Sequence, residues 1–262
     1  MTDLTRRAFL LATAAGVAPL GLSAAPRPAA AAPRPYGSVP IAGFVDPARP
    51  FVARLWGPRE LVASYARRYG SARSDGASIQ VDVHGYCPCE EGSPDAYRSS
   101  TWVIDFDQPK VRGLLGGARF STPEDASVWV CAAIDKKNMS RGFDVASVVA
   151  SRREGDCSEH AVLLAAVLRA QGIPARVVFG VYIDGPRAGD GAALEGFGHA
   201  WTEAWSGPRD GWRGVDATRP GAPVAGRHLA GASLDDESPG YHRGILAAVD
   251  ASQPSRIVVA AR

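Results

Sequence analysis

The stretch from Arg152 to Pro174 constrains the fold more than any other part of the chain, because it contains both ends of one apolar helix. Alanine, valine and leucine recur through its middle at the spacing that buries one helical face. Gly172 is typical of a left-handed helix end, and the proline that follows prevents the helix from resuming. At the other end, a Gly-Asp turn brings Cys157 into the first helical turn. The stretch therefore predicts a buried helix with a thiol at its N-terminus.

The position of Cys157 favours a reactive thiol. Unpaired backbone N–H groups and the positive end of the helix dipole favour the thiolate, which is the nucleophilic form. The same N–H groups can stabilise an oxyanion on a carbonyl that the thiolate attacks. The alternative interpretation is that Cys157 is a small buried hydrophobic residue, as free cysteines usually are.

The length of the chain, 262 residues, allows one large domain or two small ones with an ample core. A hydrophobic fraction of 46% and a charged fraction of 21% are typical of globular proteins. The 29 glycines and 20 prolines favour many turns over a helical bundle.

Residues 1–31 predict an export signal rather than part of the fold. A twin-arginine pattern at Arg6 and Arg7 precedes an apolar run, and the alanines at 29–31 fit a cleavage site. Glycines and Pro19 make the run a poor membrane-spanning helix, although a retained membrane anchor is the alternative. The signal resembles the bacterial twin-arginine export class. We therefore expect the mature protein in the periplasm or outside the cell.

The charge of the chain does not indicate an electrostatic nucleic-acid binder. The formal net charge is +2, and the predicted signal carries three arginines and one aspartate, so the mature chain is close to neutral. No other stretch is long and apolar enough to span a bilayer. We expect no nucleic-acid partner and no stable membrane insertion after signal cleavage, and the sequence does not indicate an oligomeric state.

The first half of the mature chain predicts no chemistry of its own. Residues 32–50 are rich in proline, alanine and arginine and predict a linker. Residues 51–120 predict an N-terminal α/β extension whose role the sequence does not indicate. It contains a helix over 58–69 and alternating strands over 79–83 and 102–106 that are expected to pair.

Cys87 and Cys89 leave three interpretations open. With His84 they could begin a metal site, but no second set of residues has ligand spacing. A redox pair is conceivable, although Cys-X-Cys is not the thioredoxin-like Cys-X-X-Cys arrangement. We favour a structural disulfide from one of them to Cys131 in an exported protein. That pairing leaves Cys157 as a free thiol.

Residues 121–220 predict an α+β core, which the C-terminal extension over 221–262 completes. Helices precede the cysteine, and residues that alternate or are β-branched follow it. The expected elements are helices from 122 and over 144–152, the cysteine helix, and strands over 175–183, 199–205, 212–216 and 257–259.

His199 and Asp216 supply the partners that a thiol nucleophile needs, namely a base and a group that orients the imidazole. His199 opens one predicted strand and Asp216 ends the next, so antiparallel pairing would bring them together. Taken singly, they could be an ordinary strand histidine and a turn former. His160, at i+3 from Cys157, is the competing base. A helical pair lacks an orienting third group, so we assign it a packing or supporting role, and we predict that His228 is solvated in a loop.

Four motifs occur together in order: Gly155–Ala161, Gly172–Arg176, His199–Glu203 and Trp212–Thr218. Together they resemble the transglutaminase-like superfamily of bacterial papain-related cysteine enzymes, over about residues 122–220. The resemblance implies a papain-like α+β core in which a helix that carries the nucleophilic cysteine packs on an antiparallel sheet.

The resemblance assigns roles by motif position: Cys157 is the nucleophile, His199 the base and Asp216 the orienting acid. The family's usual Asp-Pro-Thr is Asp-Ala-Thr here, which leaves the acid in place. The motifs do not assign the second oxyanion donor. The residues expected to support the site or bind substrate are Trp201, Glu203 and His160.

The leading hypothesis is an exported cysteine enzyme that acts on amide or peptide bonds of a protein or peptide substrate through an acyl-thioester. Water as second substrate gives a protease or amidase, which we favour, and an amine gives a protein-glutamine acyltransferase. One alternative is a non-catalytic peptide- or protein-binding module that retains the fold, and another is a structural or redox protein organised around Cys87 and Cys89. We expect no cofactor and, because no EF-hand-like loop occurs, no metal.

Overall fold

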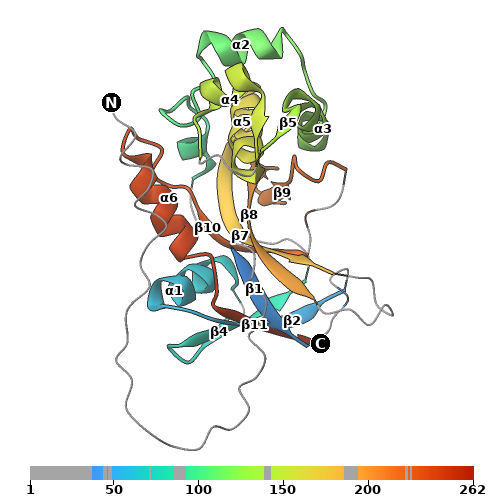
Figure 1. The fold of residues 1–262 in the computed structure, drawn as a ribbon, viewed down its shortest axis with the longest axis vertical. Coiled ribbons are helices and arrows are strands. Elements are labelled where there is room, and N and C mark those ends of the chain that lie inside the picture. The colour runs from blue at the N-terminus through green and yellow to red at the C-terminus, as the bar shows by residue number, and fades with distance from the viewer. Residues whose placement is uncertain are drawn as a thin grey trace, which may run out of the picture. The chain divides into compact units, whose positions relative to one another are not determined.

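One mixed sheet runs through most of the described chain (Figure 1). The computed structural model describes residues 37–43, 46, 49–70, 72–84, 93–138, 143–185, 194–221, 224 and 226–262. All of them lie in one compact unit, residues 35–262. The strands of the sheet are β1 (Ser38–Ala42), β2 (Phe51–Trp56), β3 (Arg73–Ser74), β4 (Ser78–Val83), β7 (Ala175–Asp184), β8 (Glu195–Trp205), β9 (Trp212–Val215), β10 (His228–Ser233) and β11 (Arg256–Ala261).

The sheet is predominantly antiparallel, in the order β10-β7-β8-β1-β11-β2-β4-β3, with β9 also paired to β8. Only the β1–β11 pairing is parallel among the described strands of this sheet. A separate two-stranded ladder joins β5 (Lys136–Lys137) to β6 (Glu154–Gly155). This small ladder lies directly before the predicted nucleophile helix.

The β7–β8 hairpin positions most of the predicted site. Its register runs from Ala175 opposite Ala204 to Asp184 opposite Glu195. All residues of β7 except the last are buried, which explains a nearly continuous apolar sequence instead of alternation. β1 and β9 pair with the same edge of β8, β1 near its start and β9 near its end. The segment that follows β9 therefore lies beside the middle of β8.

Helices gather at one end of the β7–β8 hairpin (Figure 1). They are α2 (Pro109–Leu115), α3 (Pro123–Ala133), α4 (Ala146–Arg152) and α5 (Cys157–Arg169). The α5 helix packs on β7 and β8, and all its residues from the third onward are buried. Each fully buried leucine of this helix contributes about 1.5–3 kcal/mol. This confirms the predicted α+β class, with the cysteine helix packed on an antiparallel-dominated sheet.

The remaining helices α1 (Arg59–Arg68) and α6 (Tyr241–Asp250) pack on β10, and a 3-10 turn, η1 (Pro94–Tyr97), contacts β7. Among the described residues, no helix is both long and apolar enough to cross a membrane.

A buried ion-pair network joins α1 to the central hairpin. Glu203 on β8 accepts from Arg68 Nη1 at 2.8 Å and from Arg176 Nε at 2.6 Å. All three side chains are buried, and Arg176 also lies over the Trp212 ring, 4.2 Å from its centroid. Removing one partner of such a buried ion pair is strongly destabilising, because the other charge stays buried without a partner and without contact with solvent.

The prediction of a strand over 102–106 is wrong. These residues form a turn in which Val103 and Ile104 are both buried while Trp102 is 58% exposed, so the inside–outside alternation is broken. The partner of β4 is instead β2, with Phe51 opposite Val83. The predicted linker and tail also contain elements that the sequence analysis missed, namely β1, β10 and α6.

Candidate active site

Cys157 is the first residue of α5, and the turn before it is fixed by side-chain caps. The Asp156 carboxylate accepts from the backbone N–H of Ser158 at 2.9 Å. In return, Glu159 accepts from the backbone N–H of Asp156 at 2.8 Å. Gly155 is required here, because a Cβ at that position would overlap the Glu159 side chain. The sequence around the cysteine is therefore determined by the geometry that presents the thiol at the helix start.

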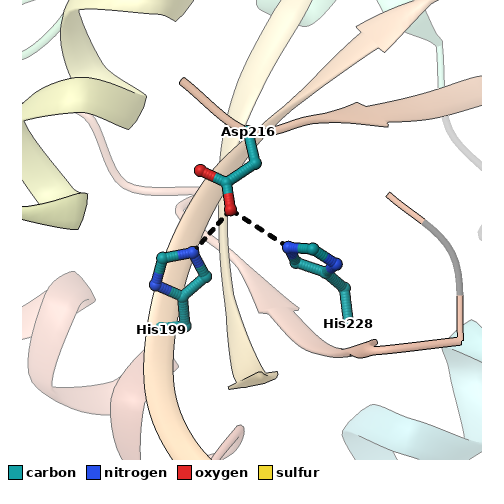
Figure 2. A group of neighbouring side chains, drawn as sticks. All are labelled: His199, Asp216 and His228. Carbon is teal, nitrogen blue, oxygen red and sulfur yellow. Dashed lines mark hydrogen bonds and ion pairs between the residues drawn. The ribbon is translucent and has the colours of Figure 1, made fainter. Parts of the chain in front are cut away.

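His199 and Asp216 meet as predicted from their strands. The β8–β9 register places Thr202 opposite Val215, so Asp216 lies just past the end of β9, near the middle of β8. His199 Nε2 lies 2.8 Å from Asp216 Oδ2 (Figure 2). The other carboxylate oxygen of Asp216 accepts from Thr218, at 2.8 Å from its backbone N–H and 2.7 Å from its hydroxyl. Since Nε2 is occupied, Nδ1 is the ring nitrogen left for Cys157, which lines the same cavity as His199.

The electrostatics of this pair favour a protonated histidine. Burial alone would lower the pKa of His199, but its hydrogen bond to Asp216 and its interactions with Cys157 and with the charge of Asp216 raise it to about 9. Burial alone would raise the pKa of Asp216, but hydrogen bonds from His199, His228 and Thr218 hold it far below its usual range. At neutral pH the site therefore contains an imidazolium beside an ionised carboxylate.

His228 is a site residue that the sequence analysis placed wrongly. It lies on β10 rather than in a loop and is 4% exposed rather than solvated. Its Nε2 is 3.1 Å from the same Asp216 oxygen that His199 contacts (Figure 2). Burial lowers its pKa, so the ring is neutral and donates from Nε2 to the carboxylate. No described group bonds its buried Nδ1. The short strand of small residues around it carries no sequence signal of this contact.

Aromatic side chains pack around the two histidines. Trp201, fully buried, stacks beside His199 with ring centroids 6.0 Å apart and contacts His228 edge-on at 5.1 Å. Tyr182 contacts both histidine rings edge-on, at 5.8 Å and 5.0 Å. Gly180 makes room for this packing, since a Cβ there would lie 2.6 Å from the Trp201 ring. These contacts restrict the histidines to the orientations that meet Asp216.

The other predicted supporting residues occupy different positions. His160 is buried, and both of its ring nitrogens are used: Nδ1 donates to the Asp156 carbonyl at 2.5 Å, and Nε2 accepts from Lys137 at 2.6 Å. Burial, with the Lys137 charge, lowers the pKa of His160, so it stays neutral beside the nucleophile rather than acting as its base. Glu203 belongs to the ion-pair network described above and does not line the cavity.

A cavity of about 530 Å³ opens beside Cys157 and His199. It is a size that suits part of a peptide rather than a whole folded partner. Its lining consists of Lys137, Gly155, Asp156, Cys157, His160, Tyr182, Phe197, Gly198, His199, Thr218 and Arg219.

His199, Asp216 and His228 are also the one described group whose spacing could hold a metal ion, with ligand atoms within 4.8 Å of one another. The two histidine nitrogens, however, lie at hydrogen-bond distance from a single carboxylate oxygen. A cation there would also displace the Nε2 proton through which His199 donates to Asp216. The donor set therefore fits a hydrogen-bonded network better than a metal centre.

Several predicted features fall outside the described residues, namely the export signal over 1–31, most of the predicted linker, and Cys87 and Cys89. Cys131 carries a free thiol, so the predicted disulfide is not formed at that residue in this structure. Cys157 is the other free thiol among the described cysteines.

The fold and the site define a papain-like arrangement, with a thiol at a helix start and a His–Asp pair on the adjoining sheet. Residues 120–217 match the model of the transglutaminase-like superfamily, which confirms the resemblance predicted from the four motifs. A protein-glutamine gamma-glutamyltransferase of Pseudomonas aeruginosa is 47% identical over 74 residues. That segment is 27% of this chain and 11% of the relative, so the chain spans only a small part of that enzyme.

Solved structures that align with part of this chain include a putative cysteine protease from Cytophaga hutchinsonii, with a TM-score of 0.45 and 18% identity over 71% of this chain and 61% of that chain. The periplasmic domain of TgpA from Pseudomonas aeruginosa aligns with a TM-score of 0.33 and 23% identity over 54% of this chain and 52% of that chain.

Proposed function

We propose that this protein is an exported cysteine enzyme that acts on amide or peptide bonds through an acyl-thioester. The observation that carries the proposal is the His199–Asp216 hydrogen bond in the same cavity as Cys157, the first residue of α5. Cys157 is the nucleophile, His199 transfers the proton, and Asp216 orients and charges the imidazole.

In the acylation step, the Cys157 thiolate attacks the carbonyl carbon and a C–S bond forms. Backbone N–H groups at the positive end of α5 stabilise the oxyanion of the tetrahedral intermediate. Protonated His199 Nδ1 gives its proton to the departing nitrogen, the C–N bond breaks, and the amine leaves. The enzyme is left as a thioester, with a neutral His199 that can now act as a base.

The second substrate decides the reaction class. Neutral His199 removes a proton from water or from an amine, the new nucleophile attacks the thioester, and the Cys157 sulfur departs as the thiolate. Water completes a peptidase or amidase reaction, and an amine completes a protein-glutamine acyl transfer. The name of the gamma-glutamyltransferase relative supports the second outcome over its 74 aligned residues. The cavity beside the thiol supports a peptide-like substrate in either case.

The proposal of export rests on the sequence of residues 1–31, with its twin-arginine pattern and alanine-rich end. Fusion of these residues to a reporter that is active only after export tests it, with Arg6→Lys and Arg7→Lys together as the variant that should stop transport.

The test of the chemistry is the rate at which iodoacetamide alkylates Cys157 as a function of pH. The tryptic peptide 154–169 contains no other cysteine, so mass spectrometry reads this thiol alone. We expect fast labelling at pH 6–7, below the ordinary thiol range of about 8.5, and at least tenfold slower labelling in His199→Ala.

Two further results decide between an enzyme and a binding module. Cys157→Ala should abolish incorporation of a fluorescent amine into casein and release of peptide from it. Slow labelling of wild type and His199→Ala alike, with an ordinary pH profile, would overturn the proposal in favour of a module that only binds peptides.

A further inference from the structure

Besides His199, two cationic side chains, Lys137 and Arg219, line the cavity beside the thiol, and Lys137 already uses all its hydrogen-bond donors. Lys137 Nζ donates to the Cys131 carbonyl at 3.2 Å, to the Ile134 carbonyl at 2.8 Å and to His160 Nε2 at 2.6 Å. An ammonium group has three donors, so Lys137 has none left for a ligand. Its role is to hold the loop and the histidine beside α5.

Arg219, unlike Lys137, has a side chain that contacts an aromatic ring instead of donating hydrogen bonds to described groups. Its guanidinium carbon lies over the Tyr182 ring, 3.8 Å from the centroid, and Tyr182 in turn contacts His199. The backbone N–H of Arg219 donates to the Asp216 carbonyl at 3.2 Å, so the chain at its base is anchored to the site. Within the described ranges, the guanidinium nitrogens have no hydrogen-bond or ion-pair partner.

The carboxylates near Arg219 are already used elsewhere. Asp156 also lines the cavity, but its side chain caps α5 through Ser158. Asp216 is 3% exposed and receives its hydrogen bonds from His199, His228 and Thr218. The cavity therefore contains an accessible guanidinium that no described acidic group neutralises.

We propose that Arg219 recognises a carboxylate on the substrate while the scissile amide lies at Cys157, which makes peptides that present a carboxylate near the scissile bond the substrate class. This rests on the function proposed above and adds to it the chemistry of the recognised group. A guanidinium binds a carboxylate through two parallel hydrogen bonds, and the contact with the Tyr182 ring holds the Arg219 guanidinium beside the site. The carboxylate comes from an acidic side chain or from a free peptide C-terminus.

The experiment compares two alkylating reagents of nearly equal size in one tube. Iodoacetate carries the carboxylate and iodoacetamide is its neutral counterpart; both place a CH₂ group on the Cys157 sulfur and release iodide. The protein reacts with an equimolar mixture of the two reagents at pH 7 and low salt, and the measured quantity is the ratio of the two products on peptide 154–169. Changes in thiol reactivity that affect both reagents equally cancel in this ratio.

We expect the ratio of iodoacetate to iodoacetamide product to fall about fivefold in Arg219→Gln and less in Arg219→Lys, which keeps the charge but not the planar fork. The matched control is Arg256→Gln, an arginine that also lies over an aromatic ring, Trp56, but does not line the cavity. An unchanged ratio in Arg219→Gln, with fast labelling by iodoacetamide, overturns this inference alone. Slow labelling of wild type by both reagents overturns the proposed function as well.

Three N-acetylated peptides of one length then distinguish the sources of the carboxylate. One has a glutamate side chain and an amidated C-terminus, one has glutamine and a free C-terminus, and one has glutamine and an amidated C-terminus. The peptide that protects Cys157 from iodoacetamide in wild type, and loses this effect in Arg219→Gln, identifies the source. Equal effects of all three peptides would overturn carboxylate recognition.

Discussion

Asp216→Asn should remove the proton from His199 at neutral pH. The carboxylate raises the pKa of His199 through the 2.8 Å hydrogen bond and through its charge, Cys157 also raises it, and burial opposes both. Together these effects hold the pKa at about 9, against an ordinary value of 6.5. The difference corresponds to about 3 kcal/mol in favour of the protonated ring, since one pKa unit is about 1.4 kcal/mol.

Asparagine keeps the shape of the side chain, and its amide oxygen can still accept from Nε2, but it carries no charge. We expect the pKa of His199 in the variant to fall to 6.5 or below, because burial then outweighs the remaining contribution of Cys157. Wild-type His199 stays protonated up to about pH 9, whereas the variant loses the proton above about pH 6.5. The alkylation rate of Cys157 at pH 7–8 should therefore fall at least tenfold.

The assay is a titration of the histidine Cε1–H resonances by NMR. The chain has five histidines, and the resonance that disappears in His199→Gln identifies the one of interest. Asp210→Asn is the matched control, since it makes the same substitution in the exposed turn between β8 and β9. A His199 pKa that stays above 8 in Asp216→Asn would refute the reasoning, because the carboxylate would then not be its main support.

Three further predictions concern the surroundings of the site. His228→Phe should slow alkylation of Cys157 about fivefold with little change in the thermal midpoint, since it removes one donor to the carboxylate; an unchanged rate would exclude a positioning role. Gly180→Ala should lower the free energy of urea unfolding by at least about 2 kcal/mol through overlap with the Leu229 carbonyl, whereas Gly113→Ala, with open space around it, should raise it by up to about 1 kcal/mol. Glu203→Gln should cost about 3–5 kcal/mol in the same assay, against less than about 1 kcal/mol for Glu124→Gln in its exposed pair with Arg213.

Local signals in the sequence were sufficient for the part of the fold that carries the thiol. The Gly-Asp turn before Cys157, the apolar run and Gly172 mark the start, the buried length and the end of α5 in the local sequence. The meeting of His199 with Asp216 was also predictable, because two consecutive strands joined by a short turn pair antiparallel.

The missed elements depend on partners far away in the sequence. Strand β1 contains Pro40 and lies between β8 and β11, so only its distant neighbours make it a strand. Strand β10 is a run of small residues that pairs with β7, and His228 reaches Asp216 only through that pairing. The turn over 102–106 was wrongly predicted to be a strand, because its residue types alternate but no neighbouring strand among the described residues pairs with it.

The arrangement of charge around Asp216 explains why, in the proposed chemistry, the proton of His199 moves toward the cavity and not toward the acid. Four hydrogen bonds, from His199, His228 and two groups of Thr218, hold the carboxylate ionised, and they account for both of its oxygens. Since Asp216 cannot accept the proton of His199 at neutral pH, that proton can move only from Nδ1, on the side of Cys157 and the cavity. His228 therefore stabilises the negative charge of Asp216. Trp201 and Tyr182 pack against His199, which carries the proton that is transferred.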